Sequence, residues 1–326
     1  MINSRVVAVT GANGFIGLHI VNKLLSHNFK VIATVRDAND EKKTCDLKKL
    51  ENQQNLKIMS ADLFQKDKFL EIFKEVDSVI HNASPLISSD KEDDFVKPAL
   101  AGVQNVFEAI LEQPKGKIRN VIFTSSMAAV CGAPGSKPSD YVFSEKDWSD
   151  PQNQRERKAW YALSKTLAEQ KVLSFEEQLL EKGITLTRIC PTLVLGPLLQ
   201  TSGINSSVKH IIGYLTGEKK EIPQYSMSLI DVRDVAEMNY QALIKNQSGR
   251  FIGAEKGYTF EQIIEMMKKY SGPYANNIPT KVAEGEKATP SLFDLKKTHE
   301  LVGGKLISAE QSIKDTIDSI INKKLI

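Results

Sequence analysis

The sequence has few cysteines, little net charge and no long hydrophobic run. Its three cysteines, Cys45, Cys131 and Cys190, have neither a CxxC pair nor histidine companions at metal-ligand spacing. We therefore expect reduced thiols, no disulfide framework and no metal site. The formal net charge is only +3, and without a dense basic stripe nucleic acid is not expected as a partner. No run approaches the roughly 18 apolar residues of a membrane span, so no membrane partner is expected either.

What is present is typical of a folded protein of ordinary composition. The chain has 326 residues, of which 41% are hydrophobic and 25% are charged. That length suits one large α/β domain with a smaller unit beside it. The first apolar run begins at Val6, which leaves no room for a targeting peptide, so the expected location is cytoplasmic.

One stretch near the N-terminus is especially informative. An apolar run at residues 6–10 leads into Gly11, Gly14 and Gly17, and an amphipathic helical pattern follows over residues 16–25. This order of strand, glycine turn and helix is typical of dinucleotide binding. The first glycine allows a tight turn, and the second lets the backbone approach a pyrophosphate. The third lets the helix lie against the sheet, so that its N-terminus can hold the phosphate charge.

The end of the second expected strand bears on which dinucleotide is bound. An acidic residue there would accept a hydrogen bond from the ribose 2′-hydroxyl of NAD. Val35 occupies that position and Arg36 follows it. A guanidinium suits the 2′-phosphate of NADP, which Lys42 or Lys43 could also reach. In the alternative reading Arg36 is a surface charge and Asp37 serves the ribose; we favour NADP(H).

Apolar runs alternate with helical patterns along the first half of the chain. This alternation predicts an α/β fold with a Rossmann-type, doubly wound parallel sheet. Ligands of such sheets bind at the carboxyl edge, where Asp62, His81 and Ala83 stand. Asp62 could meet an adenine edge or cap the next helix, Ala83 is expected along the cofactor, and His81 is read as a core or loop residue. The expected strands are residues 6–10, 30–35, 56–60, 78–81, 120–124 and 184–190, and the further helices are residues 41–52, 67–75 and 95–113.

A second informative stretch is YALSKTLAEQ at residues 161–170. Tyr161 and Lys165 are four residues apart in a helical sequence, so both project from one face. There the ammonium can approach the phenol oxygen and favour its ionised form, which lets the tyrosine exchange a proton with a substrate oxygen. Ser126, at the end of an expected strand, could donate a hydrogen bond to the same oxygen. Hydride transfer from a nicotinamide to a carbonyl needs this set of donors.

Together these motifs resemble the extended short-chain dehydrogenase/reductases, in the branch that holds dihydroflavonol reductase, cinnamoyl-CoA reductase and the yeast methylglyoxal and ketone reductases. The resemblance rests on VTGANGFIG at 9–17, ATVRD at 33–37, ADL at 61–63, VIFTSS at 121–126, FSEKDWS at 143–149, YALSKTLAEQ at 161–170 and PTLVLGP at 191–197.

The resemblance implies roles for individual residues. Ser126, Tyr161 and Lys165 would form the catalytic set, with Lys165 also on the nicotinamide ribose. The expected cofactor contacts are Gly11, Gly14, Phe15 and Ile16 at the pyrophosphate with Gly17 behind them, Arg36 and Lys43 at the 2′-phosphate, Asp62 and Leu63 at the adenine, Ala83 along the cofactor, and Pro191 and Val194 near the nicotinamide.

The alternation of strands and helices weakens after residue 190. We expect residues 1–190 to form the NADP-binding domain, with residues 226–245 returning to it. Residues 191–326 would then form a smaller α+β lobe that carries the substrate pocket. The expected elements there are helices at 204–215, 231–244, 259–270 and 308–323 and strands at 226–230 and 250–253.

The substrate pocket is less clearly marked than the cofactor site. Residues 152–159 depart from the plant members of the branch, and the pocket candidates are Tyr225, Met227 and residues 198–215. Asp231 and Asp234 stand at a helix start and are read as structural.

The predicted function is NADPH-dependent reduction of an aldehyde or ketone to an alcohol, with Tyr161 as the proton donor. The expected partner is a small-molecule substrate, and the chain could be a monomer or a homodimer. A sugar-nucleotide epimerase or dehydratase on the same scaffold usually needs a tightly held NAD and an acid at the position of Val35. A steroid-type dehydrogenase and a non-catalytic NADP-sensing protein are further alternatives, although the latter typically lacks the tyrosine or the lysine.

Overall fold

The computed structural model of the chain describes residues 5–84, 89–132, 136–201 and 203–326. Its centre is a seven-stranded sheet in the order β10-β7-β5-β4-β1-β2-β3, in which neighbouring strands are parallel. The predicted α/β fold with a doubly wound parallel sheet is thereby confirmed. The strands are β1 (Val6–Thr10), β2 (Lys30–Val35), β3 (Leu56–Ser60), β4 (Ser78–His81), β5 (Asn120–Thr124), β7 (Thr185–Pro191) and β10 (Gly249–Gly253).

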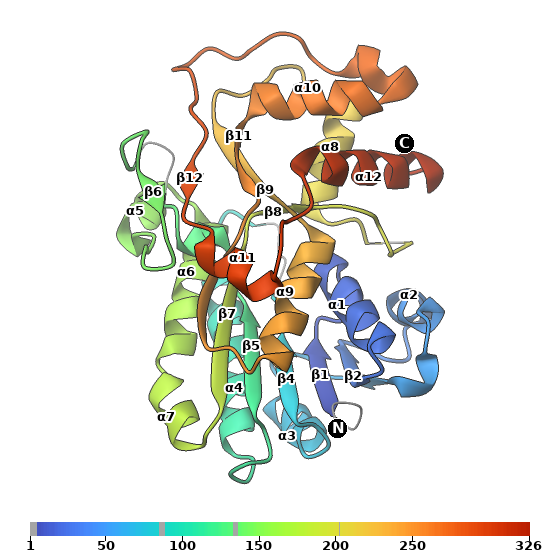
Figure 1. The fold of residues 1–326 in the computed structure, drawn as a ribbon, viewed down its shortest axis with the longest axis vertical. Coiled ribbons are helices and arrows are strands. Elements are labelled where there is room, and N and C mark those ends of the chain that lie inside the picture. The colour runs from blue at the N-terminus through green and yellow to red at the C-terminus, as the bar shows by residue number, and fades with distance from the viewer. Residues whose placement is uncertain (1–4, 85–88, 133–135, 202) are drawn as a thin grey trace.

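Alternate residues of the central strands contribute to two separate cores. Val7 and Val9 of β1 belong to one cluster of buried side chains, and Ala8 between them belongs to the other. Because successive side chains of a strand point to opposite faces, helices must cover both faces of this sheet. The first face carries α1 (Phe15–Ser26) and α9 (Val232–Ile244), and the second carries α3 (Lys66–Phe73), α4 (Glu92–Leu111) and α6 (Trp160–Leu173) (Figure 1).

A second group of elements lies beyond the carboxyl ends of the central strands (Figure 1). It contains a three-stranded sheet in the order β11-β9-β8, with β8 and β9 parallel and β11 antiparallel to β9. A separate parallel pair joins β6 to β12. The strands are β6 (Val142–Phe143), β8 (Leu193–Leu195), β9 (Ser226–Asp231), β11 (Lys256–Thr259) and β12 (Leu292–Phe293), and the helices of the chain not yet named are α2 (Glu41–Thr44), α5 (Pro151–Glu156), α7 (Glu176–Glu181), α8 (Ser206–Leu215), α10 (Phe260–Tyr270), α11 (Lys296–Val302) and α12 (Ala309–Asn322).

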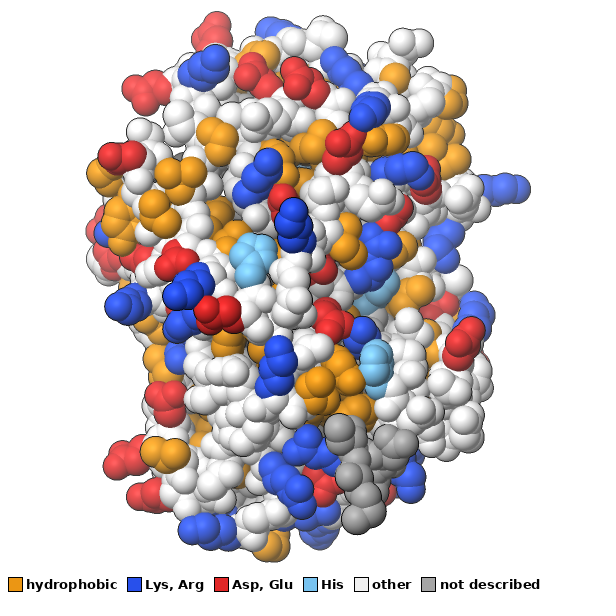
Figure 2. All heavy atoms as spheres, viewed as in Figure 1, with side chains coloured by type: hydrophobic (Ala, Val, Ile, Leu, Met, Phe, Trp, Pro, Cys, Tyr) orange, Lys and Arg blue, Asp and Glu red, His pale blue; other side chains and the backbone are white. Residues whose placement is uncertain are grey.

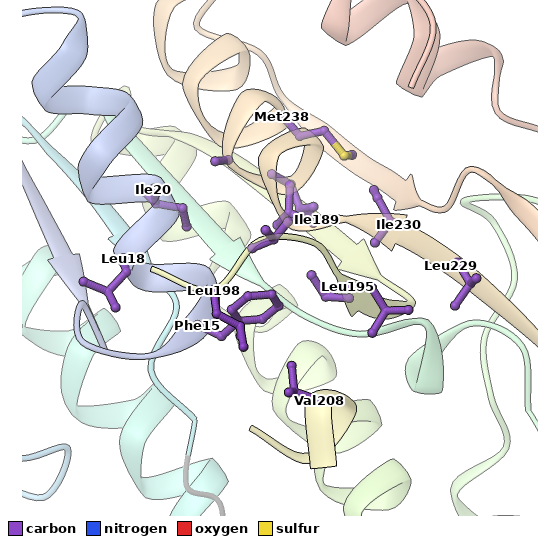
Figure 3. Close-up of a cluster of buried hydrophobic side chains, with 14 of the residues drawn as sticks. Phe15, Leu18, Ile20, Ile189, Leu195, Leu198, Val208, Leu229, Ile230 and Met238 are labelled. Carbon is purple, nitrogen blue, oxygen red and sulfur yellow. The ribbon is translucent and has the colours of Figure 1, made fainter. Parts of the chain in front are cut away.

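One hydrophobic cluster connects the two groups of elements. Figure 3 shows Phe15 of α1 beside Leu198, with Leu195 and Val208 in the same cluster. Burial of these side chains fixes the C-terminal elements against the helix that follows the glycine turn. The core therefore runs across residue 190, and a division into two domains at that residue stays a prediction.

The expected helix over residues 41–52 is wrong as a continuous element. The segment forms α2 and a short 3-10 turn at Leu47–Lys49, and a second 3-10 turn follows it at Gln53–Asn55. Asp46, at the break, accepts hydrogen bonds from the backbone N–H (2.9 Å) and the hydroxyl (2.7 Å) of Thr201. This contact with a distant segment holds Asp46 outside a continuous helix. Asn52 has a left-handed backbone with φ 59°, which a right-handed helix cannot include.

The segment beyond residue 190 also contributes to the main sheet. β10 extends that sheet by pairing with β7, so that Arg250 lies opposite Arg188. β9, in contrast, belongs to the three-stranded sheet, and it is α9 that packs against α1. Lysine, arginine and acidic side chains are scattered over the face shown in Figure 2. Among the described residues, no helix combines the length and the apolar character that crossing a bilayer requires.

Candidate active site

A cleft of about 590 Å³ opens at the carboxyl ends of the central strands. It lies where the strand order reverses, because β1 has β2 on one side and β4 on the other. Such a switch point is where doubly wound sheets bind their ligands. The predicted site residues that line this cleft are Gly11, Gly14, Phe15, Ile16, Arg36, Lys43, Asp62, Leu63, Ala83, Ser126, Tyr161, Lys165, Pro191 and Val194.

The glycine turn brings bare backbone to the floor of the cleft. Gly11 has φ +63°, and a Cβ there would lie 2.8 Å from the Cα of Ala83. Gly14 is the N-cap of α1 and has no side chain to occupy the first N–H groups of the helix. These donors, with the positive end of the helix dipole, suit the pyrophosphate of a dinucleotide. The residues present therefore fit the predicted cofactor.

Gly17 is not among the residues that line the cleft. A Cβ at this position would lie only 2.2 Å from the carbonyl oxygen of Gly11 and 2.9 Å from the Cα of Ala12. Its lack of a side chain thus allows α1 to pack against the turn, and its contribution to the cleft is indirect.

The histidine at the end of β4 is a core residue. His81 is 1% exposed, and its Nδ1 forms a 2.8 Å hydrogen bond with the hydroxyl of Thr10. The Thr10 hydroxyl also accepts a 3.0 Å hydrogen bond from the backbone N–H of Ala83. Burial, reinforced by the charge of Lys165, lowers the pKa of His81 to about 3, so the ring is neutral. Thr10 and His81 together fix the backbone of Ala83 at the cleft.

Two cations line the far end of the cleft, near the ends of β2 and β3. Arg36 Nε lies 3.3 Å from Asp62 Oδ2. Lys43 lines the cleft, whereas Lys42 and Asp37 do not. Asp62 does not cap α3, because its Oδ1 accepts from the N–H of Phe64 at 3.0 Å and α3 begins at Lys66 after Gln65.

Ser126, Tyr161 and Lys165 come from two elements and line the same cleft. Ser126 follows β5, and its Oγ accepts a 3.1 Å hydrogen bond from the N–H of Ala128, which leaves its own proton to donate. Tyr161 and Lys165 stand one helical turn apart on α6. The tyrosine is 43% exposed and the lysine is 8% exposed, and both line the cleft.

A second cavity of about 870 Å³ adjoins the cleft. Its walls include Met127, Tyr141 and Phe143 from the first half of the chain, and Tyr225 and Met227 from the second. The structure thus places both single-residue pocket candidates in this cavity. The residues that line the cleft and the cavity alike are Ser126, Tyr161, Pro191, Thr192, Ser206 and Ser207.

The structure also brings neighbours of the predicted residues to the cleft. Asn82 and Ser84 line it on either side of Ala83, and Ser206 and Ser207, within the pocket-candidate segment 198–215, close it from the start of α8. Asn205, which also lines the cleft, caps α8 by accepting from the N–H of Val208 at 2.8 Å. An Asn before a helical pattern is a recognisable start signal, but only the fold shows that this helix start faces the cofactor cleft.

The chain is similar along its length to known proteins. Residues 7–252 match the NAD dependent epimerase/dehydratase family. Cinnamoyl-CoA reductase 1 of Petunia hybrida is 36% identical, over 99% of this chain and 94% of its own length. Tetraketide alpha-pyrone reductase 2 of Arabidopsis thaliana is 32% identical, over 98% of both chains. The structure of yeast methylglyoxal/isovaleraldehyde reductase complexed with NADPH superposes with a TM-score of 0.84 at 28% identity, over 98% of this chain and 99% of that one.

Proposed function

This chain belongs to the NAD dependent epimerase/dehydratase family, among the extended short-chain dehydrogenase/reductases, and is an NADP-dependent oxidoreductase; from this premise we propose that it reduces an aldehyde or ketone to an alcohol. One observation carries the proposal. Ser126 and Tyr161 line both the cofactor cleft and the second cavity. A carbonyl group bound in the second cavity would meet both hydroxyl groups at the boundary with the cleft.

The chain's own residues supply the protonation half of the reaction. The bound NADPH supplies a hydride. Tyr161 would give its phenolic proton to the carbonyl oxygen, and Ser126 would donate a hydrogen bond to that oxygen as negative charge develops on it. The positive charge of Lys165, one helical turn away on α6, would attract the negative charge left on the Tyr161 oxygen once its proton has been transferred.

The remaining cleft residues would hold the cofactor. Gly11, Gly14, Phe15 and Ile16 would contact the pyrophosphate through the backbone of the turn and the start of α1. The other expected contacts are Arg36 and Lys43 at the 2′-phosphate, Asp62 and Leu63 at the adenine, Ala83 along the cofactor, Lys165 at the nicotinamide ribose, and Pro191 and Val194 near the nicotinamide.

The domain division, the location and the oligomeric state stay predictions. We propose that residues 191–326, apart from the segments that pack on the main sheet, act as the substrate lobe. The second cavity, with Tyr225 and Met227 in its wall, supports this assignment. A cytoplasmic location and a monomeric or homodimeric state are also still predictions.

The test follows NADPH consumption with small aldehydes, diketones and bulky aromatic ketones. The wild type should consume NADPH with at least one class, and Tyr161→Phe should lose about 100-fold or more of kcat while its affinity for NADPH stays nearly unchanged. Tyr240→Phe, on α9 beside His27, is the matched control and should keep its turnover. Failure of every carbonyl despite NADPH binding, or full turnover by Tyr161→Phe, would overturn the proposal.

A further inference from the structure

Behind the catalytic residues of α6 lies a buried ion pair. Glu169 of α6 is 0% exposed, and the side chain of Arg250 from β10 is 4% exposed. Arg250 Nε lies 2.7 Å from Glu169 Oε1, and Arg250 Nη2 lies 2.9 Å from Oε2. Two parallel contacts of this kind fix the partners in direction as well as in distance.

The same pair holds the segment of Ser126 from both sides. Ser125 Oγ donates a 2.7 Å hydrogen bond to Glu169 Oε2. Arg250 Nη2 donates a 3.1 Å hydrogen bond to the carbonyl oxygen of Ala129. Ser126 thus lies between two residues that are bound to one ion pair.

Glu169 also belongs to the helix that carries the other two catalytic residues. Tyr161, Lys165 and Glu169 follow one another at intervals of four residues, which places them along one side of α6. Glu169, held by Arg250, therefore fixes the Ser126 segment at the end of β5 against the helix that carries Tyr161. The distance between the hydroxyl groups of Ser126 and Tyr161 depends on that placement.

The pair reaches the wall of the second cavity as well. Arg250 Nη1 donates to the carbonyl oxygens of Glu145, at 3.2 Å, and of Asp147. Its guanidinium lies 4.0 Å from the ring centre of Trp148. This loop follows directly after Phe143, which lines the second cavity.

Stability alone is a weak explanation for this arrangement. A second guanidinium, that of Arg188, lies 3.7 Å from Glu169, so one buried carboxylate faces two cations. The cost of removing buried charges from water offsets much of their mutual attraction. Well-packed apolar side chains in the same place often stabilise a fold to the same extent. The contacts to Ser125 and Ala129 give the pair a geometric role that apolar side chains could not supply.

We propose that Glu169 and Arg250 are positioning residues, which set the hydroxyl of Ser126 at its working distance from Tyr161. This inference rests on the proposed carbonyl reduction. It predicts that loss of the pair lowers kcat chiefly through Ser126, while binding of NADPH, whose expected phosphate contacts are at the glycine turn, Arg36 and Lys43, changes little.

The experiment is a double-mutant cycle measured with NADPH and a carbonyl that the wild type reduces. Glu169→Gln in the wild-type background should lower kcat by about 10- to 100-fold, since a displacement of about 1 Å can cost that much. In the Ser126→Ala background the same change should cost less than about 3-fold, because the misplaced hydroxyl is already absent. The Kd of NADPH, measured by fluorescence, should stay within about 2-fold of the parent protein in both backgrounds.

Further variants test the same role without removing the Glu169 carboxylate. Ser125→Ala removes only one hydrogen bond to the Glu169 carboxylate and keeps the ion pair, so it should fold and still lower kcat by about 3-fold or more. Arg250→Lys, which keeps the charge, should recover part of the activity that Arg250→Met loses. The matched control is Asp231→Asn, because Asp231 is also 0% exposed and is bound by Arg233 through two contacts of 2.8 Å; it should lower the Tm and keep kcat.

The outcomes separate the two proposals. Equal loss of kcat from Glu169→Gln in both backgrounds, or an unchanged kcat in folded Ser125→Ala, would overturn the positioning role while carbonyl reduction stands. A wild type that binds NADPH and reduces no carbonyl would overturn both.

Discussion

Arg36 and Asp62 form an ion pair at the end of the cleft, with Arg36 Nε 3.3 Å from Asp62 Oδ2. The Arg36 side chain is otherwise 86% exposed, so the contact through Nε orients the guanidinium and leaves its terminal N–H groups for another acceptor. The other oxygen of Asp62 accepts from the backbone N–H of Phe64. Because this hydrogen bond orients the carboxylate of Asp62, the carboxylate can orient the Arg36 side chain in turn. The planar fork of N–H donors suits a phosphate.

Arg36→Ala is therefore expected to weaken NADPH binding and to spare NADH binding. Loss of charge-assisted hydrogen bonds to the 2′-phosphate should raise the Kd of NADPH by about 10- to 100-fold. NADH has no such phosphate, so its Kd should change by less than about 3-fold. Fluorescence titration with both cofactors measures the difference. Equal weakening of both cofactors would show that Arg36 does not select the phosphate.

The two neighbouring lysines of α2 are expected to differ in their effects. Lys43 lines the cleft and Lys42 does not, although the sequence left both open as phosphate ligands. Lys43→Ala should raise the KM for NADPH by several-fold, about 3- to 10-fold for one exposed charge contact. Lys42→Ala is the matched control, with the same change of charge one residue away. A larger effect from Lys42 would contradict the placement.

The glycine turn and the helix after it could be predicted because their signals are local. Gly11 and Gly14 are close to each other in the sequence, and the apolar spacing of α1 repeats within it. The pairing of Tyr161 with Lys165 is local too, since one helical turn separates them. Ser126 is expected to join them because it stands at the end of a predicted strand, and the family resemblance implies the same; the parallel strands of the fold provide the physical reason.

Other features depend on contacts between distant residues. The break after α2 is set by Asp46 and Thr201, which are 155 residues apart, and no local pattern indicates it. β10 joins the edge of the main sheet through backbone pairing with β7, in which Arg250 lies opposite Arg188, and this is another long-range contact. Glu169 stood within a quoted motif, yet only the fold shows that its helix position is buried against Arg250.

Gly17→Ala is expected to destabilise the fold and to weaken NADPH binding together. The added Cβ would lie 2.2 Å from the carbonyl oxygen of Gly11, so α1 or the turn must move. Overpacking of this kind costs about 1–3 kcal/mol of unfolding free energy, and the displaced turn would hold the pyrophosphate less well. Chemical denaturation and NADPH titration measure the two effects. Gly304→Ala, where nothing lies within 4 Å of the new Cβ, should show neither; a stable Gly17→Ala with normal affinity would contradict the packing role.

His81 is expected to make the fold sensitive to acid. Burial, with the nearby charge of Lys165, lowers its pKa from 6.5 to about 3. The ring therefore stays neutral in the folded chain but takes up a proton in the unfolded chain below about pH 6.5. Its contribution to stability is present above that pH and is lost as the pH falls towards 3. Between pH 7 and pH 4 the loss should be roughly 3 kcal/mol of unfolding free energy.

Urea unfolding of the wild type and of His81→Asn at pH 7, 5.5 and 4 measures this effect. The variant should start from a lower stability, because Asn leaves space beside Phe107 and Phe123, which surround the ring. Its loss between pH 7 and pH 4, however, should be smaller than that of the wild type by roughly 3 kcal/mol. His299→Asn is the control, because water reaches that side chain in the folded chain as well, and it should show the wild-type pH dependence. If His81→Asn also retains the full pH dependence, the acid sensitivity comes from other groups and the fold does not require a neutral ring at His81.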